Sequence, residues 1–257
     1  MTGMDDGATG GGAVTEDRLL GGRVRLLQPV DGYRAAIDPV LLAAAVPARA
    51  GEQVLDLGCG AGAVTFCLTE RVPGVQVTGL EIQSVGVDLA RRNADLNHVA
   101  DRVTILPGDV ADLPEILAGR RFDRVMTNPP FWPGGRHTPS ARDHRAVSHG
   151  EGTADLSLWI GAALRLLEAR GTLTLIHAAD RLDDILALLA GRFGDVTILP
   201  LWPRAGQPAR RVIIHARRNS RGPARLLPGL VLHGAGQGYT AAAEAVLRDG
   251  QALDPAP

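Results

Sequence analysis

Four consecutive residues, Asn128-Pro129-Pro130-Phe131, could hold a flat amino group, and they follow an apolar, strand-like run. The Asn128 amide oxygen and the Pro129 carbonyl can both accept hydrogen bonds from one –NH2 group. The two prolines have no N–H and a fixed φ angle, so the backbone there is stiff and only accepts. Phe131 adds a flat face for a flat substrate. The run therefore predicts a clamp for an amino group conjugated to a ring or a carbonyl.

A glycine-rich turn after an earlier apolar run predicts a site for a nucleotide-like ligand. Gly58, Gly60 and Gly62 would leave room for close approach of a ligand at the start of a helix. Gly58, Gly60 and Ala63 also satisfy the dinucleotide pattern G-x-G-x-x-G/A, and Glu81 lies about 20 residues further on, where a ribose-binding acid belongs. The turn and Glu81 alone therefore fit both a nicotinamide dinucleotide and S-adenosylmethionine.

Acidic residues near the ends of successive strands favour S-adenosylmethionine. Asp56 would point a carboxylate into the glycine turn, where it would repel a pyrophosphate and attract the ammonium of a methionine moiety. Glu81 can accept from both ribose hydroxyls, and Asp109 from the adenine amino group, although Asp109 alone also fits a turn or cap residue. Carboxyl ends of parallel strands share one crevice. We expect the cofactor to be bound by Asp56, Gly58, Gly60, Glu81, Asp109 and Asn128.

Length and composition are those of an ordinary globular protein. The chain has 257 residues, of which 45% are hydrophobic and 21% charged, and no run of about 18 apolar residues could cross a membrane. Residues 1–12 lack the features of a signal peptide. We predict a disordered tail over 1–20 and one domain with short extensions over 21–257. Cys59 and Cys67 lack zinc-ligand spacing, so we expect a reduced cytoplasmic protein without a metal.

The charge distribution is uneven although the net charge is -1. No acidic residue lies between Asp195 and Glu244, a stretch that holds seven arginines, and a second basic cluster follows Phe131. A GC-rich genome accounts for arginine in place of lysine, but not for the missing acids. A basic face beside the site favours a polyanionic substrate, with nucleic acid preferred over a merely solvated face. The two groups are Arg204, Arg210, Arg211, Arg217, Arg218, Arg221 and Arg225, and Arg136, His137, Arg142, His144, Arg145 and His149.

Apolar runs alternate with amphipathic ones, which predicts an α/β fold with a mostly parallel sheet and helices on both faces. The proline-rich link 200–208 is too short for a helical crossover, so the last two strands of the sheet should be antiparallel. Gly171 should end the helix before it. A strand is predicted at 23–29, a helix at 38–46, and a last helix at 241–248 after a cap at 237–240. The sheet strands are predicted at 53–57, 75–80, 103–106, 122–127, 172–177, 196–199 and 211–216, and its helices at 61–71, 84–97, 154–168 and 181–192.

On these motifs the segment 54–216 resembles the class I S-adenosylmethionine-dependent methyltransferases, which have a Rossmann-like fold with a seven-stranded sheet and an antiparallel last strand. The Asn-Pro-Pro-Phe run resembles the motif of those class I enzymes that methylate planar amino groups. The segments Gln28-Pro-Val-Asp-Gly-Tyr-Arg-Ala-Ala-Ile-Asp-Pro-Val-Leu-Leu42 and Gln237-Gly-Tyr-Thr240 resemble the tRNA1(Val) adenine methyltransferase family. That resemblance implies methylation of the 6-amino group of the adenine next to the anticodon in tRNA. It also implies that Asn128, Pro129, Pro130 and Phe131 hold the base, although Tyr is common in the family where this chain has Phe131.

Four other functions stay open at this point. A methyltransferase for the glutamine amide of release factors also fits Asn-Pro-Pro-aromatic, but it would need a helical N-terminal domain of several dozen residues. An rRNA guanine amino-group methyltransferase fits the basic stretch equally well. A nicotinamide-dependent oxidoreductase is opposed by Asp56 and by the clamp. A non-catalytic RNA-binding module is opposed by the intact clamp.

Overall fold

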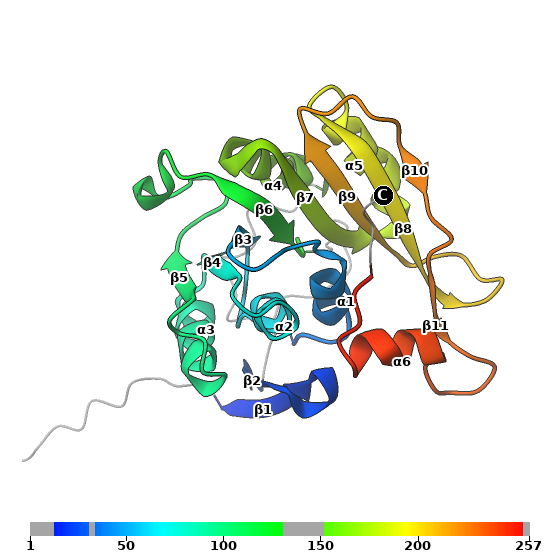
Figure 1. Cartoon of the computed structure of the whole chain (residues 1–257), viewed down its shortest axis with the longest axis horizontal. Coiled ribbons are helices and arrows are strands. Elements are labelled where there is room, and N and C mark those ends of the chain that lie inside the picture. Colours follow the sequence, from blue (N-terminus) through cyan, green and yellow to red (C-terminus); the bar gives the residue numbers. More distant parts are fainter. Residues whose placement is uncertain (1–12, 31–33, 131–151, 254–257) are drawn as a thin grey trace, which may run out of the picture.

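Seven apolar segments form the centre of one sheet in the computed structural model, which describes residues 13–30, 34–130 and 152–253 (Figure 1). The strand order is β5-β4-β3-β6-β7-β9-β8, and neighbouring strands are parallel except where β9 is involved. The predicted fold class and the antiparallel last strand are thus confirmed. The strands are β3 (Gln53–Leu57), β4 (Gln76–Glu81), β5 (Val103–Pro107), β6 (Phe122–Thr127), β7 (Leu167–Ala178), β8 (Phe193–Arg204) and β9 (Arg211–Arg218).

Two short strands extend the sheet beyond the predicted seven. β10 (Arg225–Leu226) and β11 (Leu230–His233) both run parallel to β8 along its outer edge. Pairing with β8 was not predicted for either segment. β8 itself continues to Arg204, so the first part of the predicted link 200–208 is strand rather than loop. Pro200 lies within β8, in register with Val212 on β9. Proline removes only one backbone donor, its own N–H, from the strand.

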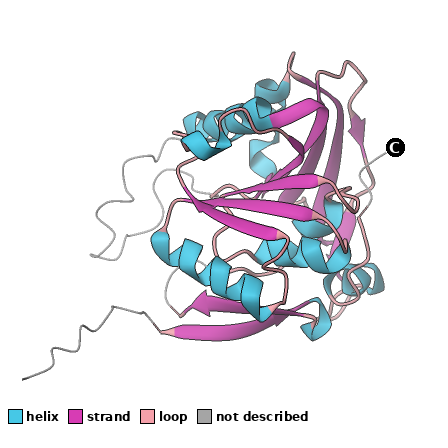
Figure 2. Cartoon of the chain, turned by 60° about the vertical axis from the view of Figure 1, so that its left-hand side comes forward, coloured by secondary structure: helices cyan, strands magenta, loops and turns pink. Residues whose placement is uncertain are grey.

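Helices cover both faces of the sheet (Figure 2). On β3, Val54 packs into the core under α1, α2, α3 and α6, while Leu55 packs into the core under α4 and α5. A parallel sheet covered on both sides needs apolar side chains on both faces, which explains its nearly continuous apolar strands. The helices are α1 (Asp38–Ala45), α2 (Ala63–Arg71), α3 (Ser84–Leu96), α4 (Gly152–Leu166), α5 (Leu182–Leu189) and α6 (Ala241–Leu247), with 3-10 turns η1 (Leu20–Gly22), η2 (Glu115–Leu117) and η4 (Ala179–Arg181).

A β-hairpin precedes the sheet. β1 (Val14–Leu19) pairs antiparallel with β2 (Val24–Pro29), so the predicted strand at 23–29 is present. The expectation of a disordered tail through residue 20 is wrong for β1, because pairing with β2 satisfies its backbone groups. Residues 1–12 lie outside the described residues.

The predicted C-terminal helix at 241–248 is present as α6, which ends at Leu247. Thr240 caps α6 as predicted, since its hydroxyl accepts a hydrogen bond from the Ala243 N–H at 3.1 Å.

The prediction that Gly171 ends a helix is wrong: α4 ends at Leu166, and Gly171 lies inside β7. There a Cβ atom would lie 3.0 Å from the Asp123 carbonyl oxygen, so glycine permits the approach of β6. No helix among the described residues has the length and apolar character needed to span a membrane.

Candidate active site

The register of the sheet brings the predicted site residues to one edge. Leu57, the last residue of β3, lies opposite Leu80 on β4 and Thr127 on β6. Glu81, the last residue of β4, lies opposite Pro107, the last residue of β5. After β3, the strands β4 and β5 are added on one side of it, and β6 and β7 are then added on its other side. Ligands of open α/β sheets bind where the strand order switches in this way. The carboxyl ends of four adjacent strands therefore lie at one edge of the sheet. They bring together the glycine turn, Glu81, Asp109 and Asn128.

The glycines of the turn between β3 and α2 lack a side chain for two different reasons. Gly58, Gly60 and Gly62 have φ angles of +67°, +55° and +91°. A Cβ atom on Gly58 would lie 2.4 Å from the Trp159 ring of α4, and one on Gly62 would lie 2.3 Å from the Phe66 ring. A Cβ atom on Gly60 would meet no atom of the described residues within 4 Å. Gly58 and Gly62 are thus required by packing, whereas Gly60 faces open space that a ligand can enter.

Glu81 supports this turn from the end of β4. Its side chain is buried, and its Oε2 accepts a hydrogen bond from the Gly60 N–H at 2.8 Å. Its Oε1 accepts from the Gln83 N–H, also at 2.8 Å. Each carboxylate oxygen has a second lone pair, so the group can still accept from hydroxyls such as those of a ribose. Glu81 is therefore fixed in place beside the open side of Gly60.

Asp56 lies deeper than the sequence indicates. Its residue is 1% exposed on β3, and its Oδ2 accepts a hydrogen bond from the Thr65 hydroxyl of α2 at 2.7 Å. Burial raises the pKa of the Asp56 carboxyl to about 7, and the negative charge of Glu81 adds to this, while the Thr65 hydrogen bond opposes it. A cation bound at the turn would favour the ionised carboxylate. Thr65 was not singled out from the sequence, because nothing in its spacing marks it as the partner of Asp56.

Asp109 serves the turn after β5. It is half-buried, and its Oδ1 accepts a hydrogen bond from the Ala111 N–H at 2.8 Å. The turn role that the sequence left open is therefore present. A contact with the adenine of a cofactor stays a prediction for its other oxygen.

The clamp segment begins directly at the end of β6. Asn128 is half-buried, Pro129 is buried and Pro130 is exposed. The Thr127 hydroxyl donates to the Leu57 carbonyl at 3.0 Å, which fastens the end of β6 to the residue before Gly58. The first three residues of the predicted clamp thus lie beside the glycine turn. Phe131 and the basic cluster from Arg136 to His149 lie outside the described residues.

Two apolar residues on this edge were not singled out by the sequence analysis. Ile82 is 63% exposed and Val85 60% exposed, directly after Glu81 and in the first turn of α3. Burying such side chains is favourable, and an apolar surface beside a site often marks a ligand contact. Their place next to Glu81 was the signal available in the sequence. Ile82 and Val85 therefore present exposed apolar side chains at the same edge of the sheet as Glu81.

The basic stretch between Asp195 and Glu244 does not form a single face. Because β9 is antiparallel, its first residue, Arg211, lies opposite Ala178 at the carboxyl end of β7. Its last residue, Arg218, lies opposite Phe193 at the start of β8. An eight-residue strand spans about 23 Å. Arg204, Arg210 and Arg211 are therefore at the edge of the site, and Arg217, Arg218 and Arg221 at the opposite edge.

Several of these arginines stabilise the fold. Arg211 pairs with Asp38 of α1 at 3.1 Å, and Arg217 with Asp195 at 3.5 Å. The Arg218 guanidinium donates to the Leu167 carbonyl. The missing acids in this stretch are thus not by themselves a sign of nucleic-acid binding.

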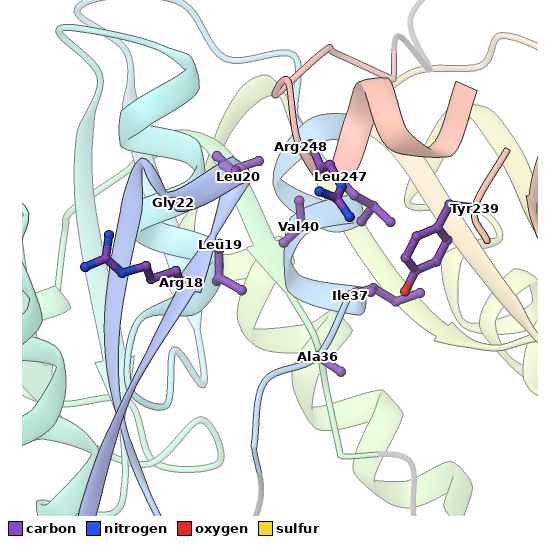
Figure 3. Close-up of a pocket in the computed structure, with 11 residues that line it drawn as sticks. Arg18, Leu19, Leu20, Gly22, Ala36, Ile37, Val40, Tyr239, Leu247 and Arg248 are labelled. Atoms are coloured by element: carbon purple, nitrogen blue, oxygen red, sulfur yellow. The ribbon is translucent and has the colours of Figure 1, made fainter. Parts of the chain in front are cut away.

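A pocket of about 430 Å³ lies apart from these residues, between the hairpin, the start of α1 and the end of α6 (Figure 3). None of the predicted site residues lines it. Tyr239 forms one wall, with its ring stacked on His233 at 4.8 Å and its hydroxyl pointing toward Ile37. The pocket is therefore separate from the site at the glycine turn.

The residues at the edge of the sheet fit S-adenosylmethionine. The open side of Gly60 would accept a ligand, and Glu81 offers acceptors for hydroxyls. The carboxyl groups of Asp56 and Glu81 would attract an ammonium and repel a pyrophosphate. The donor set therefore favours a cationic cofactor over a dinucleotide.

Comparisons with known proteins agree with this geometry. Residues 36–199 match the family model of the methyltransferase small domain. The chain is similar to the tRNA1(Val) (adenine(37)-N6)-methyltransferase of Porphyromonas gingivalis, with 34% identity over 65% of this chain and 69% of that protein. A protein of the same name from Dickeya chrysanthemi is 28% identical over 84% of this chain and 87% of its own length. The crystal structure of a predicted O-methyltransferase from Agrobacterium tumefaciens superposes with a TM-score of 0.69 and 26% identity, covering 84% of this chain and 97% of that one.

Proposed function

From the premise that this chain belongs to the methyltransferase small domain family, we propose that it methylates the 6-amino group of the adenine next to the anticodon of a tRNA. It is a methyltransferase, and S-adenosylmethionine is its cofactor. The observation that carries the choice of an amino group is the placement of Asn128 and Pro129 beside the glycine turn, fastened by Thr127. Two relatives whose names specify adenine 37 of tRNA1(Val) support the choice of base and RNA.

The cofactor would be held by the residues around the glycine turn. Gly60 lets the ligand approach the backbone of the turn, which Gly58 allows to pack against Trp159. Glu81 accepts from the ribose hydroxyls, and Asp56 balances the methionine ammonium. Asp109 accepts from the adenine amino group with its second oxygen, and Asn128 borders the methyl end. When bound, S-adenosylmethionine supplies a methyl group on a positively charged sulfur.

The clamp makes the acceptor amino group a better nucleophile. The lone pair of an adenine amino group is delocalised into its ring, so the group reacts poorly when flat. Asn128 and the Pro129 carbonyl would accept its two N–H bonds and stabilise the positive charge that develops on the nitrogen. Pro130 keeps this backbone rigid, and Phe131 would stack on the base. Positioning supplies most of the rate, and no strong base is needed, because the methylated ammonium is acidic.

The partner of this reaction is an RNA whose target base can leave its stack. Unpaired bases in loops do so at modest energetic cost, whereas duplex bases do not. We expect tRNA to reach the carboxyl edge of the sheet, and the cytoplasm to be the site of the reaction.

The test is methyl transfer from labelled S-adenosylmethionine to tRNA that lacks the modification, followed by analysis of the nucleosides. We expect label in 6-methyladenosine. Asn128→Ala should lower turnover at saturating cofactor by about 100-fold, because one fixed acceptor is lost at the reacting nitrogen. Binding of S-adenosylmethionine, measured by calorimetry, should persist in this variant.

Three results would overturn parts of the proposal. Label in a methylated guanosine keeps the cofactor and rejects adenine. Transfer to the glutamine of a release factor rejects RNA, although the hairpin at 14–29 stands where that function expects a helical domain. Full turnover in Asn128→Ala removes the clamp from the mechanism.

A further inference from the structure

The strand β2 has a second edge that is covered by side chains. β1 pairs with one edge of β2, and α3 lies along the other. Backbone N–H and C=O groups on such an edge need partners when they are shielded from water. Asn93 of α3 and Asn97, the C-cap residue that follows α3, supply them. Each side-chain amide has one acceptor and two donors, so it can imitate the peptide group of a neighbouring strand.

The contacts of the two asparagines are nearly identical. Asn97 Oδ1 accepts from the Arg25 N–H at 2.9 Å, and its Nδ2 donates to the Arg25 carbonyl at 2.7 Å. Asn93 Oδ1 accepts from the Leu27 N–H at 2.8 Å, and its Nδ2 donates to the Leu27 carbonyl at 3.0 Å.

The spacing of these residues explains why one helix can bind two positions of the strand. Four residues of helix advance about 6 Å, and two residues of strand about 6.8 Å. The pair Asn93 and Asn97 therefore matches the pair Leu27 and Arg25.

Asn93 makes one contact of another kind. Its Nδ2 also donates to the Ala61 carbonyl at 2.9 Å, and the residue is 0% exposed. Ala61 lies between Gly60 and Gly62 in the cofactor turn, and the Gly60 N–H is bound by Glu81. The turn is thus held on its two sides by Glu81 and Asn93. The third contact of Asn97 is instead to the Asn93 carbonyl, at 2.8 Å within the helix.

We propose that Asn93 is a positioning residue for the cofactor, which couples the N-terminal hairpin to the glycine turn. By fixing the carbonyl of Ala61, it sets the orientation of the peptide between Ala61 and Gly62, next to Gly60, where the backbone meets the ligand. Because the same amide group binds Leu27, docking of β2 and order in the turn support each other. The inference rests on the cofactor in the proposed function, and it is independent of the acceptor RNA.

Two matched variants separate positioning from general stability. Asn93→Ala and Asn97→Ala each remove two hydrogen bonds to β2 and one more. Both should lower the melting temperature, but only Asn93→Ala frees Ala61. We expect the Kd for S-adenosylmethionine, measured by calorimetry, to rise about tenfold in Asn93→Ala and less than twofold in Asn97→Ala. Asn93→Ser, which keeps one hydroxyl donor, should show a smaller rise and replaces the alanine variant if that variant unfolds.

Hydrogen exchange of the Leu27 amide tests the coupling separately. If Asn93 only held β2 in place, cofactor binding would not change exchange at this amide. Coupling is reciprocal, so saturating S-adenosylmethionine should slow exchange of the Leu27 amide in the wild-type protein and not in Asn93→Ala. Equal Kd changes in the two alanine variants, or no protection of Leu27 by the cofactor, would overturn the coupling. Failure of the wild-type protein to bind S-adenosylmethionine would reject the cofactor itself.

Discussion

At the scale of single residues, Asp56 shows how burial changes the chemistry of a carboxyl group. Its folded pKa of about 7 lies above the value of 3.8 for an unperturbed aspartic acid. The folded protein therefore holds this proton over a pH range in which the unfolded chain has released it. The protonated Asp56 carboxyl makes its full contribution to the free energy of unfolding below about pH 4. This contribution falls as the pH rises and is lost once the pH has passed 7.

Asp56→Asn should remove this pH dependence. The amide oxygen can still accept from Thr65, and it carries no charge that burial penalises. We expect the variant to gain stability over the wild-type protein between pH 5 and pH 7, by at most about 4 kcal/mol, and to keep a constant advantage above pH 7. Thermal melting of both proteins from pH 5 to pH 8 measures this difference. Parallel curves over that range would show that Asp56 does not titrate as described.

Residue types near the site were more predictable from sequence than their partners. Asp56, Glu81 and Asn128 could be placed because each lies at or near the end of an apolar run, and parallel strands end at one edge. The hydrogen bonds from Thr65 to Asp56 and from Asn93 to Ala61 join helices to positions that no local spacing connects. Such contacts depend on how helices pack on the sheet, which the sequence pattern does not specify.

At the scale of elements, the turn between β3 and α2 makes two different demands on its glycines. Gly58→Ala places a Cβ against the Trp159 ring in a left-handed backbone, and should cost about 3 kcal/mol of folding free energy. Gly60→Ala carries only the backbone strain, about 1 kcal/mol, because its Cβ meets open space. We expect the larger fall in melting temperature for Gly58→Ala. The folded Gly60→Ala variant should bind S-adenosylmethionine more weakly, because the new methyl group fills the approach side.

The two glycine variants serve as controls for each other in melting and calorimetry. Equal losses of stability would mean that Trp159 moves aside freely. Unchanged cofactor affinity in Gly60→Ala would place the ligand elsewhere.

Element boundaries failed where tertiary contacts replaced local signals. The apolar alternation of β7 was recognised from Thr172, but the strand begins at Leu167 and passes an irregularity against β6 between Phe122 and Arg124. β1 was missed because polar residues lie on both of its faces, and its order comes from pairing with β2. These segments are fixed by neighbours rather than by their own composition.

At the scale of the whole molecule, β9 places similar arginines at opposite edges. Arg210 precedes β9 at the edge that holds the site, and Arg221 follows β9 at the far edge; both are exposed. If tRNA approaches the clamp, only the first should lie near its phosphates. The sequence predicted a basic face because charges were counted along the chain, and strand direction determines where they lie.

Charge reversal at the two positions tests this assignment. Arg210→Glu should weaken tRNA binding several-fold and reduce its salt dependence, because each lost phosphate contact changes the slope by about one. Arg221→Glu, with the same charge change, should alter binding less than twofold. Filter binding at several salt concentrations gives both quantities. Equal effects would mean that long-range charge, and not contact at the site edge, attracts the RNA.

The position of β9 also constrains when the sheet can be completed during synthesis. β8 reaches β7 only through β9, which is made later than both. Until residues 211–218 have left the ribosome, the outer edge of β7 has no partner strand and β8 has no place in the sheet. An apolar edge of this kind can pair with other chains. The nascent protein must therefore keep β7 and β8 from aggregating until its last core strand inserts between them.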